Sequence, residues 1–359
     1  MVEPPVHLAT PYLVVDLDVL ERNVTSMAQT AHRRGVSLRP HVKTHKCLEI
    51  ASRQLAAGAI GITVATVSEA ETFVDGGFEN IFIAYPLWVD PARGARLRSL
   101  SERCSLLIGI DSAESAESLA RNGAGSDALG VLIEIDSGYH RTGVAAYGAA
   151  ELASAALRVG LDVRGVFTFP GHGYGPGQAA AAATDEAQAL ESATAALRAV
   201  GIEPGIVSGG STPTAALTHH GSATEMRPGS YVFNDAQQLE LGSCVPADVA
   251  LSAWATVVSR APGQFVLDAG SKVLGADRPA WASGYGRLAD YPDARLIALS
   301  EHHATVAWPG YIAQPALGTL LRVVPNHVCS AVNLADNLVV MRDGVVVDCW
   351  RVAARGANS

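Results

Sequence analysis

Cysteine is scarce in this sequence of 359 residues, and its five copies are widely scattered. An odd number of cysteines without paired spacing argues against a disulfide framework, so we expect a reducing, cytoplasmic environment. No apolar run reaches the length that a bilayer span requires, and residues 1–5 lack the basic and apolar regions of a signal peptide. We therefore expect no membrane partner.

Positive charge is also in short supply, since the formal net charge is −9 at pH 7. An acidic surface repels the phosphate backbone of nucleic acids, so no nucleic-acid partner is expected. The apolar content of 48% and charged content of 17% are typical of a soluble globular protein. The length exceeds what one ordinary hydrophobic core supports, which favours two domains.

An alternation of short β-type runs with helical segments occupies the first two thirds of the chain. The runs lie near residues 37–41, 60–65, 80–84, 105–110, 130–135, 163–168, 204–208 and 224–227. Eight such repeats predict an α/β fold, a (β/α)8 TIM-type barrel over residues 18–240. The count alone is also compatible with an open doubly wound sheet.

After residue 240 the pattern becomes β-rich, with strand-like runs at 249–258, 264–267, 296–299, 320–324 and 338–347. This predicts a second, mostly antiparallel β domain over residues 241–359, joined by a strand from residues 1–17. Asp18 is the expected N-cap of the helix that follows that strand, and Ser68 with Glu71 forms an expected capping box.

The most unusual polar stretch, Arg39-Pro40-His41-Val42-Lys43-Thr44-His45-Lys46, follows the first barrel strand. Functional residues of a barrel lie on the loops after the strands' carboxyl ends, so a lysine here is placed for chemistry. By composition Lys46 competes with Lys43. His41 and His45 either line a pocket or bond to nearby backbone, and a solvated basic turn is the simplest alternative.

This stretch resembles the pyridoxal 5′-phosphate (PLP) motif of the D-threonine aldolase and D-serine dehydratase family, which has an alanine-racemase-like barrel. The resemblance extends over nearly the whole chain. It implies that Lys43 carries PLP as a Schiff base, and a desolvated, electropositive pocket favours the unprotonated amine that this requires.

Two further strand-end motifs match the same family. Asp136-Ser137-Gly138-Tyr139-His140-Arg141-Thr142-Gly143 implies that Arg141 holds the phenolic oxygen of PLP. The simpler alternative is a loop arginine paired with Asp136. In Thr168-Phe169-Pro170-Gly171-His172-Gly173-Tyr174-Gly175, His172 is the candidate for stacking on the cofactor or relaying protons, and Tyr174 is a second candidate.

The loops after the seventh and eighth strands are the expected phosphate site, because glycine-rich turns expose backbone N–H groups to anions. The resemblance assigns this role to Ser208, Gly209, Gly210, Ser211, Gly229, Ser230 and Tyr231. Arg227 resembles the alanine racemase arginine that faces the pyridine nitrogen. In that position it leaves the ring a weaker electron sink.

The second domain carries a candidate metal pair, His327 and Cys329. An imidazole and a thiolate form a zinc-type ligand set, although His-x-Cys alone is a weak signal. The matching family pair binds a divalent metal, zinc or manganese, beside PLP. A nearby stretch, Ser300-Glu301-His302-His303-Ala304, departs from the family pattern of Ser-Glu-Glu-His-Gly, and there His303 matches the family histidine.

The resemblance implies a PLP- and metal-dependent lyase that acts on a D-3-hydroxy amino acid. His-x-Cys favours β-elimination to a keto acid and ammonia, whereas the stretch around His172 resembles aldolases that release glycine and an aldehyde. A racemase and a non-catalytic PLP carrier are weaker alternatives. Relatives with this domain layout pair head to tail, so a homodimer is expected.

Overall fold

The computed structural model describes residues 8–123, 129–217, 221 and 223–359. Residues 1–7 lie outside this range, so the structure does not describe the part of the chain where we expected no signal peptide and the start of the β-domain strand. Two compact units make up the chain. The barrel unit comprises Ser26–Lys43, Ala51–Gly229 and Ala357–Ser359, and the β unit comprises Met1–Thr25, Thr44–Ile50 and Ser230–Gly356.

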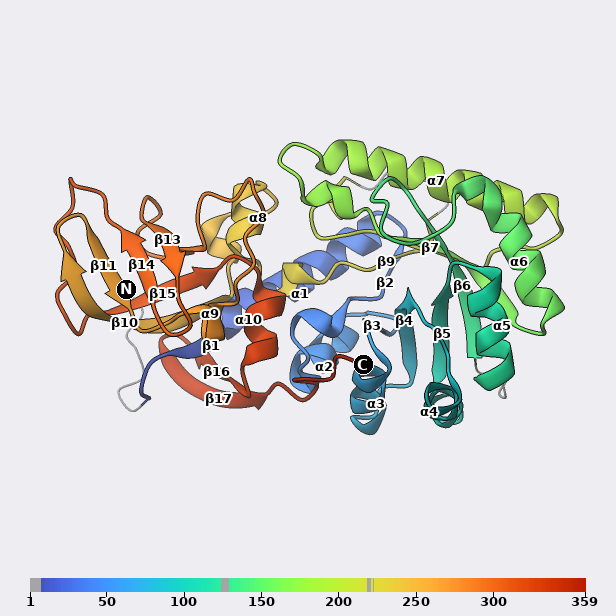
Figure 1. Ribbon diagram of the computed structural model, residues 1–359, viewed down its shortest axis with the longest axis horizontal. Coiled ribbons are helices and arrows are strands. Elements are labelled where there is room, and N and C mark those ends of the chain that lie inside the picture. Colours follow the sequence, from blue (N-terminus) through green and yellow to red (C-terminus); the bar gives the residue numbers. More distant parts are fainter. Residues whose placement is uncertain (1–7, 124–128, 218–220, 222) are drawn as a thin grey trace. The chain divides into compact units, whose positions relative to one another are not determined.

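The barrel unit contains one sheet of eight parallel strands, as the sequence predicted (Figure 1). The strands are β2 (Ser37–Leu38), β3 (Ile62–Val64), β4 (Asn80–Pro86), β5 (Ser105–Ile110), β6 (Leu129–Ile135), β7 (Asp162–Thr168), β8 (Ile206–Gly209) and β9 (Glu225–Met226). Their order is β2-β9-β8-β7-β6-β5-β4-β3. A parallel bridge between His41 and Thr63 joins the two ends of this order, so the expected (β/α)8 barrel is confirmed.

Helices separate the strands of the barrel unit. They are α3 (Val67–Asp75), α4 (Pro91–Ser101), α5 (Ala113–Asn122), α6 (Ala149–Arg158) and α7 (Ala179–Ala199), with short 3-10 turns η2 (Ala146–Gly148) and η3 (Gly171–Tyr174). Three elements pass from one unit to the other along the chain: α1 (Leu17–Arg33), η1 (Val42–Thr44) and α2 (Leu48–Ala56). No helix among the described residues combines the length and apolar content of a bilayer span.

Two expected helix caps were wrong by two residues. Asp16, rather than Asp18, accepts the backbone N–H of Val19 at 3.0 Å, and Asp18 instead pairs with Arg342. The hydroxyl of Thr66, rather than that of Ser68, accepts a hydrogen bond at the start of α3. In both cases the residue two positions earlier has the extended backbone or strand-end position that a cap requires.

Aromatic and aliphatic side chains fill the barrel interior. Phe82, Leu107, Leu132 and Phe167 form one cluster, and the rings of Phe82 and Phe167 meet edge to face with centroids 5.0 Å apart. A side chain at Gly109 would come within 2.7 Å of the Phe167 ring, so the absence of a Cβ there lets the ring fill the centre.

A buried ionic chain lies beside this apolar cluster. Arg39 donates to Glu225 at 2.9 Å, and both side chains are 3% exposed. Glu225 also accepts from the hydroxyl of Ser208 at 2.6 Å, and Ser208 accepts from Arg227. Because a buried charge without its partner typically costs about 3–5 kcal/mol, each member stabilises the barrel only together with the others.

The β unit contains a nine-stranded, mostly antiparallel sheet, which also matches expectation. Its strands are β1 (Tyr12–Asp16), β10 (Leu251–Ala261), β11 (Gln264–Leu267), β12 (Gly286–Leu288), β13 (Arg295–Leu299), β14 (Ala304–Ala307), β15 (Leu320–Pro325), β16 (Asn337–Arg342) and β17 (Val345–Arg351). The order is β11-β14-β13-β12-β15-β10-β1-β16-β17, and an additional β11–β10 pairing closes part of it into a small barrel. Its helical segments are α8 (Ala236–Glu240), α9 (Ser271–Leu274), α10 (Val328–Leu334), η4 (Ser230–Val232) and η5 (Pro246–Asp248).

Candidate active site

The side chain of Phe169, on the loop after β7, is the centre of a cluster at the carboxyl ends of the barrel strands. The Lys43 amine lies 5.9 Å from the ring centroid and the Arg141 guanidinium lies 5.2 Å from it. The rings of Tyr139 and Tyr174 lie 5.6 and 6.1 Å away. The structure therefore brings together three residues that sequence motifs selected separately, namely Lys43, Arg141 and Tyr174.

Only three lysines are present in the whole sequence, and their surroundings differ. Lys46 is buried in the β unit, where its amine donates to the side-chain oxygen of Asn333 at 2.7 Å. Lys272 is exposed and pairs with Glu301 at 2.6 Å. Lys43 lies beside the Phe169 ring, which a second cation, Arg141, also contacts, so the geometry favours it over the compositional competitor Lys46.

Arg141 does not form the ion pair with Asp136 that was its simpler interpretation. Asp136 instead accepts from the His140 side chain at 2.6 Å, and from the backbone N–H groups of Gly138 and His140 at 2.9 and 3.0 Å. Burial disfavours the Asp136 carboxylate, but these hydrogen bonds outweigh it and hold its pKa below the usual value. The Arg141 guanidinium faces Tyr139 and Phe169, where it can meet an anionic oxygen.

The three histidines from the quoted motifs have different environments. His172 in η3 pairs with Asp185 at 3.1 Å, while its buried Nδ1 atom has no hydrogen-bond partner among the described residues. Burial, with Lys43 and Arg227 nearby, lowers the pKa of His41 well below its ordinary value, and its Nδ1 likewise lacks a described partner. His45 accepts the backbone N–H of Cys47 at 3.1 Å, so for His45 the backbone-bonded alternative holds.

The glycine-rich loop after β8 has acceptors within the barrel unit. Gly210, at φ +83°, donates its N–H to the carboxyl group of Glu186, and Ser211 donates its N–H to the hydroxyl of Thr214 at 2.9 Å. Gly209 accepts the backbone N–H of Arg227 at 2.8 Å, next to Gly229 and the His41–Pro228 backbone bond. In the β unit, Ser230 and Tyr231 are buried in η4, and the Ser230 hydroxyl has no hydrogen-bond partner among the described residues.

The guanidinium of Arg227 lies inside the barrel, 6% exposed, where it donates to the Thr168 carbonyl at 2.6 Å and to Ser208. It also lies over the rings of Phe82 and Phe167, at 5.4 and 5.3 Å. Burial lowers its pKa to about 10, although Glu225 and Glu186 nearby oppose the shift. These contacts hold Arg227 rigidly, and the Ser208 hydroxyl belongs to the same chain of bonds.

Glu186 on α7 is the least expected member of the site. It is fully buried, one carboxyl oxygen accepts from Gly210, and the other has no partner among the described residues. Burial raises its pKa to about 7. The protonation state of one side chain thus governs the charge beside the candidate phosphate loop.

The Glu186→Gln variant tests this assignment. The pKa of Glu186 is higher in the folded than in the unfolded protein. Its contribution to the free energy of unfolding is therefore complete in acid and disappears as the pH rises through about 7. We expect the wild type to lose roughly 3 kcal/mol relative to the variant between about pH 5 and pH 8. Urea unfolding of both proteins across this range measures the difference. Glu191→Gln, an exposed position on the same helix, is the control, and equal pH slopes in all three proteins would refute the assignment.

The metal candidates lie in the β unit at the start of α10. The Nδ1 atom of His327 lies 3.3 Å from a carboxyl oxygen of fully buried Asp235, which also accepts the N–H of Val328 at 3.1 Å. The Cys329 sulfur lies 3.4 Å from the hydroxyl of Thr44. Burial disfavours the imidazolium, but Cys329 and Asp235 outweigh it and raise the pKa of His327 well above the ordinary value.

This donor set fits a divalent metal. A carboxylate that holds one ring nitrogen leaves the other nitrogen oriented toward a metal, an arrangement common to metal-binding histidines. Within the described ranges no cluster of three or more His, Cys, Asp or Glu side chains could hold a metal ion. His327 and Cys329 would therefore be joined by water or substrate, as in sites that keep open positions. The neighbouring candidate His303 is exposed.

Three members of these sites were not identified from the sequence. Phe169 lies inside a quoted motif, but its role emerges only from the rings and cations around it. Glu186 lies in an alanine-rich helix and Asp235 precedes α8, and neither position carries a motif. An acidic residue on the apolar face of α7 was the one available signal for Glu186.

Comparison with known families places these residues in a context. Residues 15–237 match the family described as "Alanine racemase, N-terminal domain", and residues 250–341 match "Putative serine dehydratase domain". The chain is 37% identical to a D-threo-3-hydroxyaspartate dehydratase of Delftia sp., over 90% of this chain and 91% of that protein. It is 35% identical to a D-threonine aldolase of Arthrobacter sp., over 99% and 94%.

Solved structures give the same picture. A D-threonine aldolase from Filomicrobium marinum superposes with a TM-score of 0.89 at 34% identity, covering 98% of this chain and 97% of that one. The Delftia dehydratase superposes with a TM-score of 0.87 at 35% identity, over 96% and 97%. Two variant structures of a D-threo-3-hydroxyaspartate dehydratase also match this chain. One has a cysteine changed to alanine and is in a metal-free form, and the other has a histidine changed to alanine two positions earlier.

Proposed function

Since the chain belongs to the alanine racemase-like family that includes these lyases, we propose that it is a PLP- and divalent-metal-dependent dehydratase of D-3-hydroxy amino acids. Its products would be a keto acid and ammonia. The observation that carries the proposal is the His327–Cys329 pair with Asp235 behind it, in a chain that also clusters Lys43 and Arg141 around Phe169. The fold and the lyase class are those of its relatives.

The residues of the barrel unit fit PLP. Lys43 would hold the cofactor covalently and Arg141 would hold its phenolic oxygen. The loop after β8 would hold the phosphate if the N–H groups of Gly210 and Ser211 exchanged Glu186 and Thr214 for phosphate oxygens. The Nδ1 atom of buried His41, at the same strand ends, has no hydrogen-bond partner among the described residues. A bound cofactor would supply the partner that a buried polar atom usually has. When bound, PLP supplies an electron sink that acidifies the α-proton of an amino acid.

Lys43 is the group that would move the α-proton. The Arg141 guanidinium contacts the same Phe169 ring as the Lys43 amine, and a neighbouring cation favours the neutral amine that a base requires. Hydroxide is a poor leaving group, so the hydroxyl must be protonated or bound to a Lewis acid as it leaves. A divalent ion on His327 and Cys329 would supply the Lewis acidity. Asp235 would keep the His327 ring oriented for that role.

Support for the metal comes from the relatives. The histidine and cysteine altered in the solved dehydratase variants have the spacing of His327 and Cys329, and the structure of the cysteine variant is of a metal-free form. Zinc suits an imidazole and a thiolate better than manganese does, so we propose zinc. We further propose that the protein is a homodimer and that it is cytoplasmic. Sedimentation of the purified protein tests the dimer.

A D-threonine aldolase is the second candidate, because an aldolase of that name matches 99% of this chain. Product analysis with D-serine, D-threonine and D-threo-phenylserine separates the two. We expect pyruvate and 2-oxobutyrate with ammonia from the first two substrates. Acetaldehyde or benzaldehyde together with glycine would instead establish cleavage, and interconversion of D- and L-serine alone would establish a racemase.

A further inference from the structure

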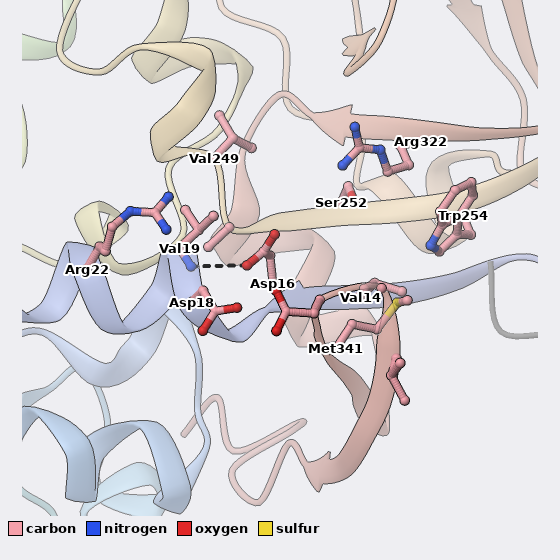
Figure 2. A pocket seen from close by; sticks show the side chains of 14 residues that line it. Val14, Asp16, Asp18, Val19, Arg22, Val249, Ser252, Trp254, Arg322 and Met341 are labelled. Carbon is pink, nitrogen blue, oxygen red and sulfur yellow. Dashed lines mark hydrogen bonds between the residues drawn. The ribbon is translucent and has the colours of Figure 1, made fainter. Parts of the chain in front are cut away.

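A cavity of about 760 Å3 lies on the outer face of the sheet in the β unit and shares no lining residue with the candidate active site (Figure 2). We call it the outer-sheet cavity. Its lining includes Val14, Asp16, Ser252, Trp254, Arg322 and Met341. Its volume is in the range of small-molecule sites.

The register of three strands sets the order of side chains along the cavity. Trp254 of β10 pairs with Arg322 of β15, and Ser252 of β10 pairs with Val14 of β1. Residues two apart on a strand share a face, so Ser252 and Trp254 both point outward beside Arg322. Figure 2 shows Arg322 close to Ser252, with Trp254 farther along the same strand.

This end of the cavity presents hydrogen-bond donors. Trp254 is 4% exposed, yet its buried indole N–H has no hydrogen-bond partner among the described residues. Arg322 donates from Nε and Nη2 to Asp290 at 3.2 and 2.5 Å, which leaves Nη1 for another acceptor. A buried donor without an acceptor costs about 1–3 kcal/mol, so an acceptor at this point is strongly favoured.

The opposite end is acidic. Asp16 lies two residues from Val14, which places it about 7 Å along the strand from the level of Ser252. It caps α1 with one carboxyl oxygen. Asp18, which pairs with Arg342, lines the cavity with it, and so do Asp343 and Arg22, so three aspartates face two arginines and this end stays net negative. Between the two ends lie the apolar side chains of Val14 and Met341, which pack with Trp254 in one cluster.

We propose that the outer-sheet cavity binds a small monocarboxylate with an apolar body, whose carboxylate meets Ser252 and Arg322 and, once the side chains packed over it shift, the buried Trp254 N–H. A carboxylate offers several acceptor positions and matches the planar guanidinium. The apolar middle takes the body of the molecule. The aspartates outnumber the arginines at the far end, so a second negative charge is disfavoured there and a dicarboxylate should bind more weakly. This site does not depend on the lyase activity or on PLP.

Calorimetric titration of the PLP-loaded protein with hexanoate, acetate and adipate tests the proposal. Hexanoate should bind, acetate should bind at least about tenfold more weakly because it lacks the apolar body, and adipate more weakly still. Trp254→Phe keeps the ring but removes the N–H, and it should weaken hexanoate binding about tenfold. Ser252→Ala should weaken it to a smaller extent.

The matched control is Trp88→Phe, an exposed tryptophan of the barrel unit, which should leave hexanoate binding unchanged. Thermal melts of each variant check that the β unit is folded. The proposal is wrong if Trp254→Phe and Ser252→Ala, both folded, bind hexanoate as the wild type does, or if adipate binds as tightly as hexanoate. Covalent PLP and product formation should be unaffected in Trp254→Phe, which separates this site from the proposed active site.

Discussion

The Lys43→Ala variant should lose covalently bound PLP completely and should retain no more than about a thousandth of the lyase activity, since a proton-transferring group contributes up to about 10⁴-fold. The Lys43 amine lies over the ring of Phe169, which Arg141 also contacts, whereas Lys46 and Lys272 pair with Asn333 and Glu301. Borohydride reduction followed by peptide mass spectrometry locates the attachment site. That measurement does not require activity, so it tests the assignment even in a poor catalyst.

Lys272→Ala is the matched control, because it removes a lysine that pairs with Glu301 on the surface. It should keep both the cofactor and the activity. A reduced PLP adduct on Lys46 or Lys272, or an unchanged adduct mass in Lys43→Ala, would refute the assignment of Lys43. Tyrosine substitution of nearby Phe169 should retain the adduct, since the ring is preserved.

The second large effect is expected at the metal pair. His327→Ala and Cys329→Ala should each bind less than about a tenth of the wild-type metal and lose most of the dehydratase activity, as removal of one of few ligands implies. Asp235→Asn should weaken metal binding by about 10–100-fold, because it affects only the orientation of the His327 ring. Elemental analysis of dialysed protein gives the metal content directly.

Cys349→Ser provides the control, since this cysteine is exposed and distant in sequence from the pair. Treatment with EDTA should reproduce the effect of His327→Ala in the wild type, and zinc should restore activity. Full activity after EDTA, with no metal detected, would contradict the proposed metal dependence. The protein would then be a lyase that depends on PLP but not on a metal.

Most of the fold follows from local pattern. In the barrel, buried strands read as short apolar runs bounded by helices, and each observed strand overlaps an expected one. Two strands of the β unit, Gly286–Leu288 and Ala304–Ala307, were missed. They are three and four residues long, and an alternation of apolar and polar residues is hard to recognise over so short a segment.

The caps and the site illustrate what a sequence leaves open. Asp16 and Asp18 are equally good cap residues, and only the end of β1 selects the first. The cofactor residues came from motifs, but motifs could not reveal that Glu186 lies against Gly210, because the two are 24 positions apart. Burial of a carboxyl group is a property of tertiary packing, and no spacing rule encodes it.

The position of β1 limits how this protein can be dissected. β1 lies between β10 and β16, paired antiparallel with one and parallel with the other, although some 230 residues separate it from β10. A fragment starting at Ser230 would therefore lack an interior strand and present two unprotected edges to solvent. Neither unit can be obtained by a single cut of the gene, and a working excision would need the first segment spliced back by a linker.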